Sequence, residues 1–308
     1  MSNARSLFNS RIASLVNSLG IDAVQARPLT EQAHNDVARM LRNGLAVVGF
    51  AALEDFIKSR ISEVLSEVGS TNVPFGRLPE KLQYAVTFEA LSAISYQMGL
   101  RPNKSDRILY AQEHTQKIAS TATAAYNLTP HALGYDQANV QDETIKGMLK
   151  CFQIDNPWGE ITRIASRLSL AALPLDETYR SAAIRRHRAA HVAHADTPQT
   201  DLQQFSKEAL AIAIGFDALL SCALSKLRLH DAPYLHGQAK VSAADITIRK
   251  VFPAGSKWRE ELEGRSTAVK IEASKDVLLA AARSRAAAAR NLLVIQGDGG
   301  QVVGWECY

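Results

Sequence analysis

The chain has 308 residues, of which 46% are apolar and 21% charged, and its formal net charge is +4. This length and apolar content are enough for a large folded domain with a smaller companion, and they exclude a chain too polar to fold. The mild positive charge does not by itself indicate a polyanionic partner. Its three cysteines lie far apart and form no CxxC pair, which argues against a disulfide framework and a zinc–thiolate site.

No targeting or membrane segment is expected. The N-terminal stretch is polar and is interrupted by Arg5 and Arg11, so it lacks the continuous apolar run of a signal peptide. The most apolar window, 209–224, contains Asp217 and is too short to span a bilayer. We therefore expect a cytoplasmic protein with no membrane contact.

Helix-forming residues separated by Pro or Gly extend from the start of the chain to about residue 229. In the first convincing helix, 30–68, Thr30 is the expected N-cap, and residues such as Leu41, Leu45 and Phe56 recur at helical spacing. Further helices are predicted over 79–98, 105–126, 142–152, 158–173, 177–194 and 200–229.

The composition changes after Leu229. Residues 230–237 are typical of a linker, and strand-like composition follows in 241–252, 267–271 and 292–308. Asp298, Gly299 and Gly300 predict a hairpin turn, and a helix is expected over 275–291. The predicted fold is mainly α, with a helical domain over 1–235 and a small α+β domain over 240–308.

The stretch IRRHRAAHVAHAD, residues 184–196, is the strongest candidate for a site. If the helix continues through it, His187, His191 and His194 fall at positions i, i+4 and i+7 and share one face. Arg186 and Arg188 flank that face. Histidine titrates near neutral pH and arginine offers a fixed fork of donors to phosphate oxygens, so this pattern suits phosphate chemistry.

Residues 186–191, RHRAAH, fit the R-x4-H signature of the HEPN superfamily, with a polar residue directly after the arginine. Residues 38–61 resemble the early long helix of HEPN proteins of the RiboL-PSP and MAE-28990 kind. Residues 139–154 resemble the segment that precedes their final helix pair. The resemblance covers about residues 30–229 and leaves the C-terminal part unexplained.

The resemblance implies a helical bundle that pairs as a homodimer and joins the two copies of Arg186 and His191 in one groove. It also implies a metal-independent RNA endonuclease without a cofactor, which leaves a 2′,3′-cyclic phosphate. In that reaction His191 is the general base or acid, Arg186 stabilises the transition state and His187 positions the phosphate or shares proton transfer. Glu54 matches an acidic position that orients the arginine or histidine, and Arg186 is its candidate partner.

Arg185, Arg188 and His194 are expected to contribute to binding of the RNA phosphates. Proteins with this signature commonly act as toxins or effectors in bacterial defence, so an antitoxin or a sensor is a candidate partner.

Several other interpretations remain open. The histidines and arginines at 184–194 also suit a solvated helix C-terminus, or a zinc site that the neighbouring arginines would oppose. Glu54 could instead pair with Lys58 on an exposed helix face. Arg283, Arg285 and Arg290 form either an RNA-binding surface or a solvated basic face. A catalytically inactive scaffold for oligomerisation or RNA binding is the alternative function.

Overall fold

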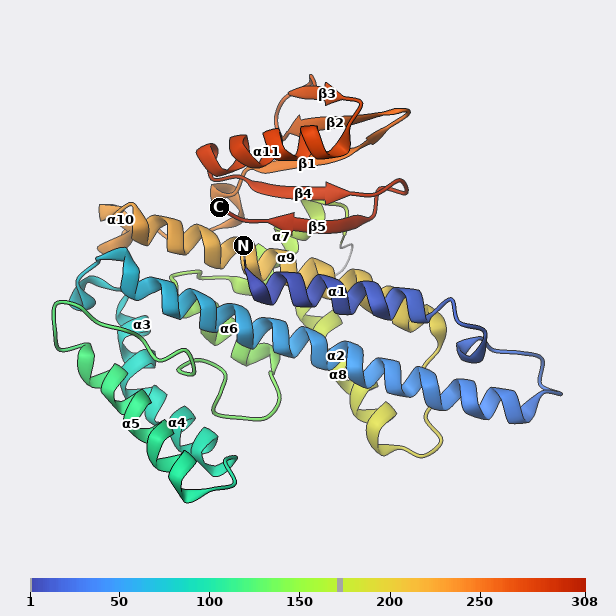
Figure 1. Cartoon of the computed structure of the whole chain (residues 1–308), viewed down its shortest axis with the longest axis horizontal. Helices are drawn as coiled ribbons and strands as arrows, with labels where there is room; N and C mark the ends of the chain where they lie inside the picture. The colour runs from blue at the N-terminus through green and yellow to red at the C-terminus, as the bar shows by residue number, and fades with distance from the viewer. Residues whose placement is uncertain (1, 171–173) are drawn as a thin grey trace.

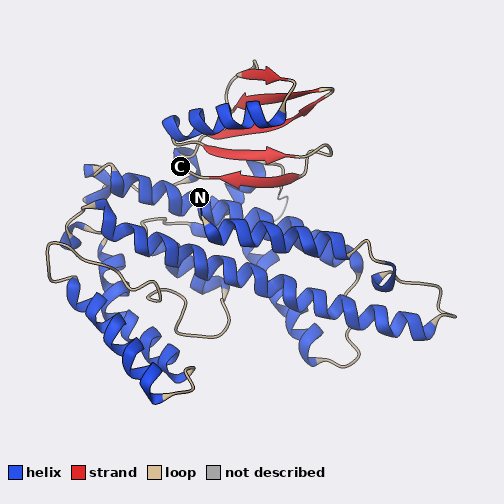
Figure 2. Cartoon of the chain, viewed as in Figure 1, coloured by secondary structure: helices blue, strands red, loops and turns tan. Residues whose placement is uncertain are grey.

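The computed structural model describes residues 2–170 and 174–308. It is mostly helical, with a small mixed sheet at the C-terminal end of the chain (Figures 1 and 2). The helices are α1 (Asn3–Ser18), α2 (Gln32–Val68), α3 (Glu80–Tyr84), α4 (Ala90–Gly99), α5 (Lys104–Ser120), α6 (Asp142–Cys151), α7 (Pro157–Arg167), α8 (Leu175–His191), α9 (Gln199–Arg228), α10 (Ala232–Leu235) and α11 (Lys275–Ala289). The strands are β1 (Ile248–Ala254), β2 (Lys257–Leu262), β3 (Lys270–Glu272), β4 (Leu292–Gln296) and β5 (Val302–Glu306).

Two long helices organise the bundle. α2 packs against α1, α8 and α9, and α9 also packs against α7 (Figure 1). The buried residues of α2 recur at helical spacing, as in Leu53, Ile57, Ile61 and Leu65, so one continuous apolar face holds the helix in place. The predicted mainly α fold with a small C-terminal α+β part is therefore observed.

α9 is the one described helix that is long and apolar enough to cross a membrane. In this structure 78% of its most apolar window is buried against the other helices. The same composition is typical of the central helix of a bundle, and that is the position α9 has here.

Several predicted boundaries are wrong. Glu31, without a side-chain hydrogen bond, occupies the N-cap of α2 in place of Thr30. α5 ends at Ser120, before the predicted residue 126, and Tyr126 lies in the following loop, where its hydroxyl donates to the carbonyl of Val73 at 2.8 Å. α7 ends at Arg167, and residues 171–173 of its predicted range lie outside the described residues.

Three elements were not predicted: α1, β2 and the short α10, which lies within the predicted linker 230–237. The exposed side of α1 is mostly polar but includes Leu7 and Val16, and its buried side includes Phe8, Ile12 and Leu15. β2 has the charged sequence KWREEL, and its central Glu260 is buried beside Arg249 and Arg285. A buried carboxylate requires such partners, and the partners lie on other elements.

The sheet has the strand order β3-β2-β1-β4-β5. β1 and β4 are parallel, and the neighbouring pairs β1–β2, β2–β3 and β4–β5 are antiparallel. The parallel pair is joined through β2, β3 and α11. The hairpin predicted at Asp298–Gly300 connects β4 and β5, and the left-handed φ of Gly300, 75°, explains the glycine there.

Alternating residues of β4 face two different layers. Leu293 and Ile295 pack with α11, whereas Leu292 and Val294 join the core of the helical bundle. Trp305 of β5 also belongs to that bundle core. β4 thus packs against α11 on one face and against the bundle on the other, and β5 is the strand that lies nearest the bundle in Figure 1.

Candidate active site

The candidate residues lie at the C-terminal end of α8, where this helix crosses α2. α8 buries Leu175, Thr178, Tyr179 and Ala182 in its first half. From residue 184 onward its side chains are exposed or only half-buried. The polar end of the helix therefore projects beyond the core that anchors its beginning.

His187 and His191 form a pair on this exposed end. Their ring centroids are 4.7 Å apart, as their i and i+4 positions require. His191 also lines an open groove of about 670 Å³, whose other wall is the stretch of α2 that includes Arg39, Asn43 and Val48. The imidazole of His191 thus lies in the wall of this groove, and that of His187 lies one helical turn away.

Arg186 lies on the opposite side of α8 from this groove. Five helical positions separate Arg186 from His191, which corresponds to roughly 140° around the axis. Nη2 of Arg186 is 3.4 Å from Oδ1 of Asn139, a long hydrogen bond, and within the described residues its buried Nε has no partner. The guanidinium is therefore only weakly held in the single chain.

Glu54 of α2 lies behind Arg186 and is 8% exposed. Its Oε1 accepts a hydrogen bond of 2.7 Å from the backbone N–H of Val140, next to Asn139. Burial raises the pKa of Glu54, and the Val140 N–H and the charges of Arg186 and Lys58 only partly oppose this.

The prediction of an exposed Glu54–Lys58 pair is wrong, because Glu54 is buried and Lys58 Nζ donates to the carbonyls of Gln137 and Ala138, each at 2.9 Å. No ion pair within 4.0 Å joins Glu54 to Arg186 in the described chain, and their interaction acts at longer range. Glu54 and Lys58 instead hold the loop 137–140 from two positions one turn apart on α2. That loop in turn carries Asn139 to Arg186.

The other three predicted residues are dispersed. Arg185 faces α9, with its Nη2 3.7 Å from Oε2 of Glu208 and its Nε 3.9 Å from Oδ2 of Asp201. Arg188 is exposed on the last turn of α8. His194 is exposed in the turn after the helix, so the expected alignment of His187, His191 and His194 on one helical face is wrong.

The early end of α8 has a physical cause that the sequence did not disclose. Asn43 of α2 donates to the carbonyl of Ala195 at 2.7 Å and accepts from the N–H of Thr197 at 3.1 Å. The neighbouring Arg42 donates to the carbonyl of Thr197 at 3.0 Å and to Asp196 at 2.6 Å. These bonds compete with continuation of the helix. An arginine and an asparagine inside the apolar pattern of α2 were the only available signal.

Within residues 2–170 and 174–308, no group of three His, Cys, Asp or Glu side chains is placed to hold a metal ion. Comparison of the chain with family models, with curated proteins and with solved structures finds no match.

Proposed function

We propose that this chain is a metal-independent RNA endonuclease of the HEPN type, acting in the cytoplasm as a toxin or effector of bacterial defence. The observation that supports this most strongly is the exposed His187–His191 pair beside a groove, on the helix that also carries Arg186. The biological role rests only on the resemblance of residues 186–191 to the R-x4-H signature.

In the proposed reaction an imidazole, that of His191 in the first instance, takes the proton of a ribose 2′-hydroxyl. The 2′-oxygen then forms a bond to the adjacent phosphorus, and the bond from phosphorus to the 5′-oxygen breaks. A second imidazole, such as that of His187, protonates the leaving oxygen. Arg186 stabilises the extra negative charge on the phosphoryl oxygens in the transition state.

Arg186 and His191 lie on different sides of α8, which favours an active site formed by two copies of the chain. Because Arg186 and His191 point in directions about 140° apart, a groove shared by two chains brings a guanidinium and an imidazole together more readily than one chain does. The weak hold on Arg186 leaves its donors available for an RNA phosphate.

An exposed stripe along α2 is suited to such pairing. It consists of small and apolar residues on one helical face: Ala33, Val37, Met40, Gly44, Val48 and Ala51. Met40 is 75% exposed and Ile184 of α8 is 62% exposed, while Gly44 faces open space that a second helix can approach closely. Contiguous exposed apolar surface of this kind is typical of a protein interface.

The experiment that tests the proposal compares two histidine variants. His191→Ala is expected to abolish cleavage of total RNA while leaving the oligomeric state and melting temperature unchanged, because the imidazole is exposed. His236→Ala, a matched control at an exposed histidine that follows α10 and lies outside α8, is expected to retain cleavage. Unchanged cleavage by His191→Ala would refute the assignment.

The exposed stripe on α2 also favours the second candidate, a scaffold that oligomerises or binds RNA without cleaving it. The two functions differ in one measurement. A scaffold would form the oligomer and bind RNA, yet the wild-type chain would leave the RNA intact.

A further inference from the structure

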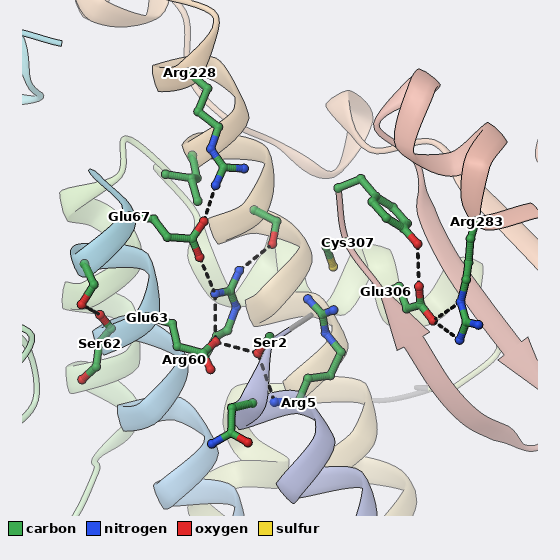
Figure 3. A pocket seen from close by; sticks show the side chains of 15 residues that line it. Ser2, Arg5, Arg60, Ser62, Glu63, Glu67, Arg228, Arg283, Glu306 and Cys307 are labelled. Atoms are coloured by element: carbon green, nitrogen blue, oxygen red, sulfur yellow. Dashed lines mark hydrogen bonds and ion pairs between the residues drawn. The ribbon is translucent and has the colours of Figure 1, made fainter. Parts of the chain in front are cut away.

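A cavity of about 900 Å³ lies where the helical bundle meets the sheet (Figure 3), and none of its lining residues belongs to α8. It is bounded by the start of α1, the C-terminal parts of α2 and α9, and the end of β5. Four arginines line it: Arg5, Arg60, Arg228 and Arg283. Its volume is within the range of sites that bind small molecules.

Two of these arginines are fixed by a carboxylate beneath the cavity. Asp217 of α9 is fully buried, and it accepts hydrogen bonds from Nε of Arg5 at 2.8 Å, Nε of Arg60 at 2.6 Å and Nε1 of Trp305 at 2.7 Å. Burial opposes ionisation of Asp217, but the two guanidinium groups outweigh it and hold its pKa well below the usual range. The arginine positions are thus set before any ligand arrives.

Three of the arginines are also neutralised by glutamates of the cavity wall. Arg60 donates to Glu63 at 3.2 Å and to Ser221 at 3.0 Å, Arg228 pairs with Glu67, and Arg283 Nη2 is 2.7 Å from Glu306. These pairs leave their donors largely engaged.

Arg5 is different. It is 5% exposed, and the only hydrogen bond that its guanidinium makes to the described residues is the one from Nε to Asp217. Figure 3 accordingly marks no bond from this guanidinium to the other lining side chains. A guanidinium has five N–H donors, and the Nη groups of Arg5 are not among the fully buried atoms without a partner, so they remain accessible from the cavity. The two Nη groups of Arg5 therefore form a pre-positioned fork for a planar or tetrahedral oxyanion.

The other residues of the cavity wall indicate which further chemical groups a ligand can have. Ser62 and Ser66 line the cavity beside Glu63 and Glu67. The hydroxyl protons of the two serines are already donated to the carbonyls of Pro130 and Ser62, so this side offers acceptor oxygens. Such a wall suits hydroxyl groups on a ligand better than further anionic groups.

We propose that this cavity binds a small hydroxylated metabolite with one phosphate or carboxylate group, held by Nη1 and Nη2 of Arg5. The ligand bridges α1, α2, α9 and β5 and therefore stabilises the seam between bundle and sheet. This site is independent of the proposed nuclease activity, and its test does not use RNA.

The test is a thermal-shift and calorimetric titration of the full chain with adenosine 5′-monophosphate, ribose 5-phosphate, gluconate and inorganic phosphate. At saturation we expect at least one of these probes to raise Tm by about 3 °C. A response to the phosphate esters alone identifies a phosphorylated ligand, and a response to gluconate alone identifies a carboxylate. No response to any probe overturns the proposal.

Two variants locate the binding. Arg5→Lys can keep its ion pair with Asp217 but loses the fork, so affinity should fall at least about tenfold. Ser66→Trp, at an exposed position outside the buried network, should block the cavity without unfolding the chain. Arg163→Gln, a surface variant outside the cavity, is the control that keeps wild-type affinity. Wild-type affinity in Ser66→Trp would contradict the proposal even if Arg5→Lys failed to fold.

Discussion

Glu54 shows how one buried carboxylate connects distant parts of the candidate site. It lies 86 positions before Val140, and its bond to the N–H of Val140 fixes the loop that carries Asn139. The pKa of Glu54 is raised because burial disfavours the charged form, so its value to the fold lies largely in its role as a hydrogen-bond acceptor.

This role predicts different results for two substitutions. Glu54→Gln keeps an acceptor for the Val140 N–H and is expected to change the free energy of unfolding by less than about 1 kcal/mol. Glu54→Ala leaves that N–H buried without an acceptor and should cost about 1–3 kcal/mol. Urea denaturation of both variants tests this. Equal losses would show that the contact to Val140 does not matter.

At the scale of single residues, the sequence allowed the prediction of site residues that are close together in the chain. Arg186, His187 and His191 could be selected because they are adjacent on one helix and are too polar for a buried face. Asp217 drew attention only as an interruption of an apolar window, since its partners Arg5, Arg60 and Trp305 are distant in sequence. The fold brings these residues together, and no pattern in a short stretch of sequence predicts that they meet.

At the scale of elements, α5 is attached to the loop that follows it by a stack of rings. Tyr110 and His114 of α5 are followed by His131 and Tyr135, with successive centroid distances of 4.0, 5.0 and 4.5 Å. Arg101 lies over Tyr110, 3.9 Å from its ring centroid. The sequence offered no partner for either histidine, because the stack joins residues on both sides of a loop.

The stack predicts a loss of stability in acid. Burial, then the nearby charges of His131 and Lys117, lowers the pKa of His114 to about 4, whereas an unfolded histidine titrates near 6.5. Between about pH 6.5 and 4 the unfolded chain therefore binds more protons, and stability falls as the pH falls. Urea midpoints from pH 7.5 to 4.5 should show a shallower decline in His114→Gln. An identical decline in both proteins would exclude His114 as the cause.

The exposed stripe on α2 makes a separate prediction for this element. Val48 is 67% exposed, so Val48→Glu should not affect folding, but a charge in the proposed interface should convert a dimer to a monomer. Leu109→Glu on α5 is the control, because Leu109 is 65% exposed on a different helix. Size-exclusion chromatography with light scattering gives the mass. A Val48→Glu variant that stays dimeric would place the interface elsewhere.

At the scale of the whole molecule, Asp217 joins the sheet to the bundle. Its carboxylate binds Arg5 of α1, Arg60 of α2 and Trp305 of β5, so four elements meet at one group. The helical class and the hairpin were predictable from periodicity and turn residues. The packing of the sheet against the bundle could not be predicted. An apolar residue in a strand does not reveal whether it will pack against α11 or against the bundle.

This arrangement predicts that bundle and sheet unfold together. Asp217→Asn leaves the buried guanidinium of Arg5 without a counter-charge and removes one of the carboxylates paired with Arg60, so it should cost about 3–5 kcal/mol. Asp55→Asn, which removes an exposed pair with Arg11, should cost less than about 1 kcal/mol. Tryptophan fluorescence and far-UV circular dichroism should report one shared transition for the wild type. Two separate transitions would contradict the coupling.

The most direct test of the proposed function is incubation of the purified protein with total RNA in EDTA, followed by analysis of the fragment ends. An attack by the 2′-hydroxyl on its own phosphodiester needs no metal ion, so we predict cleavage that leaves 2′,3′-cyclic phosphate ends. Intact RNA, or cleavage that appears only after magnesium or zinc is added, would contradict the account.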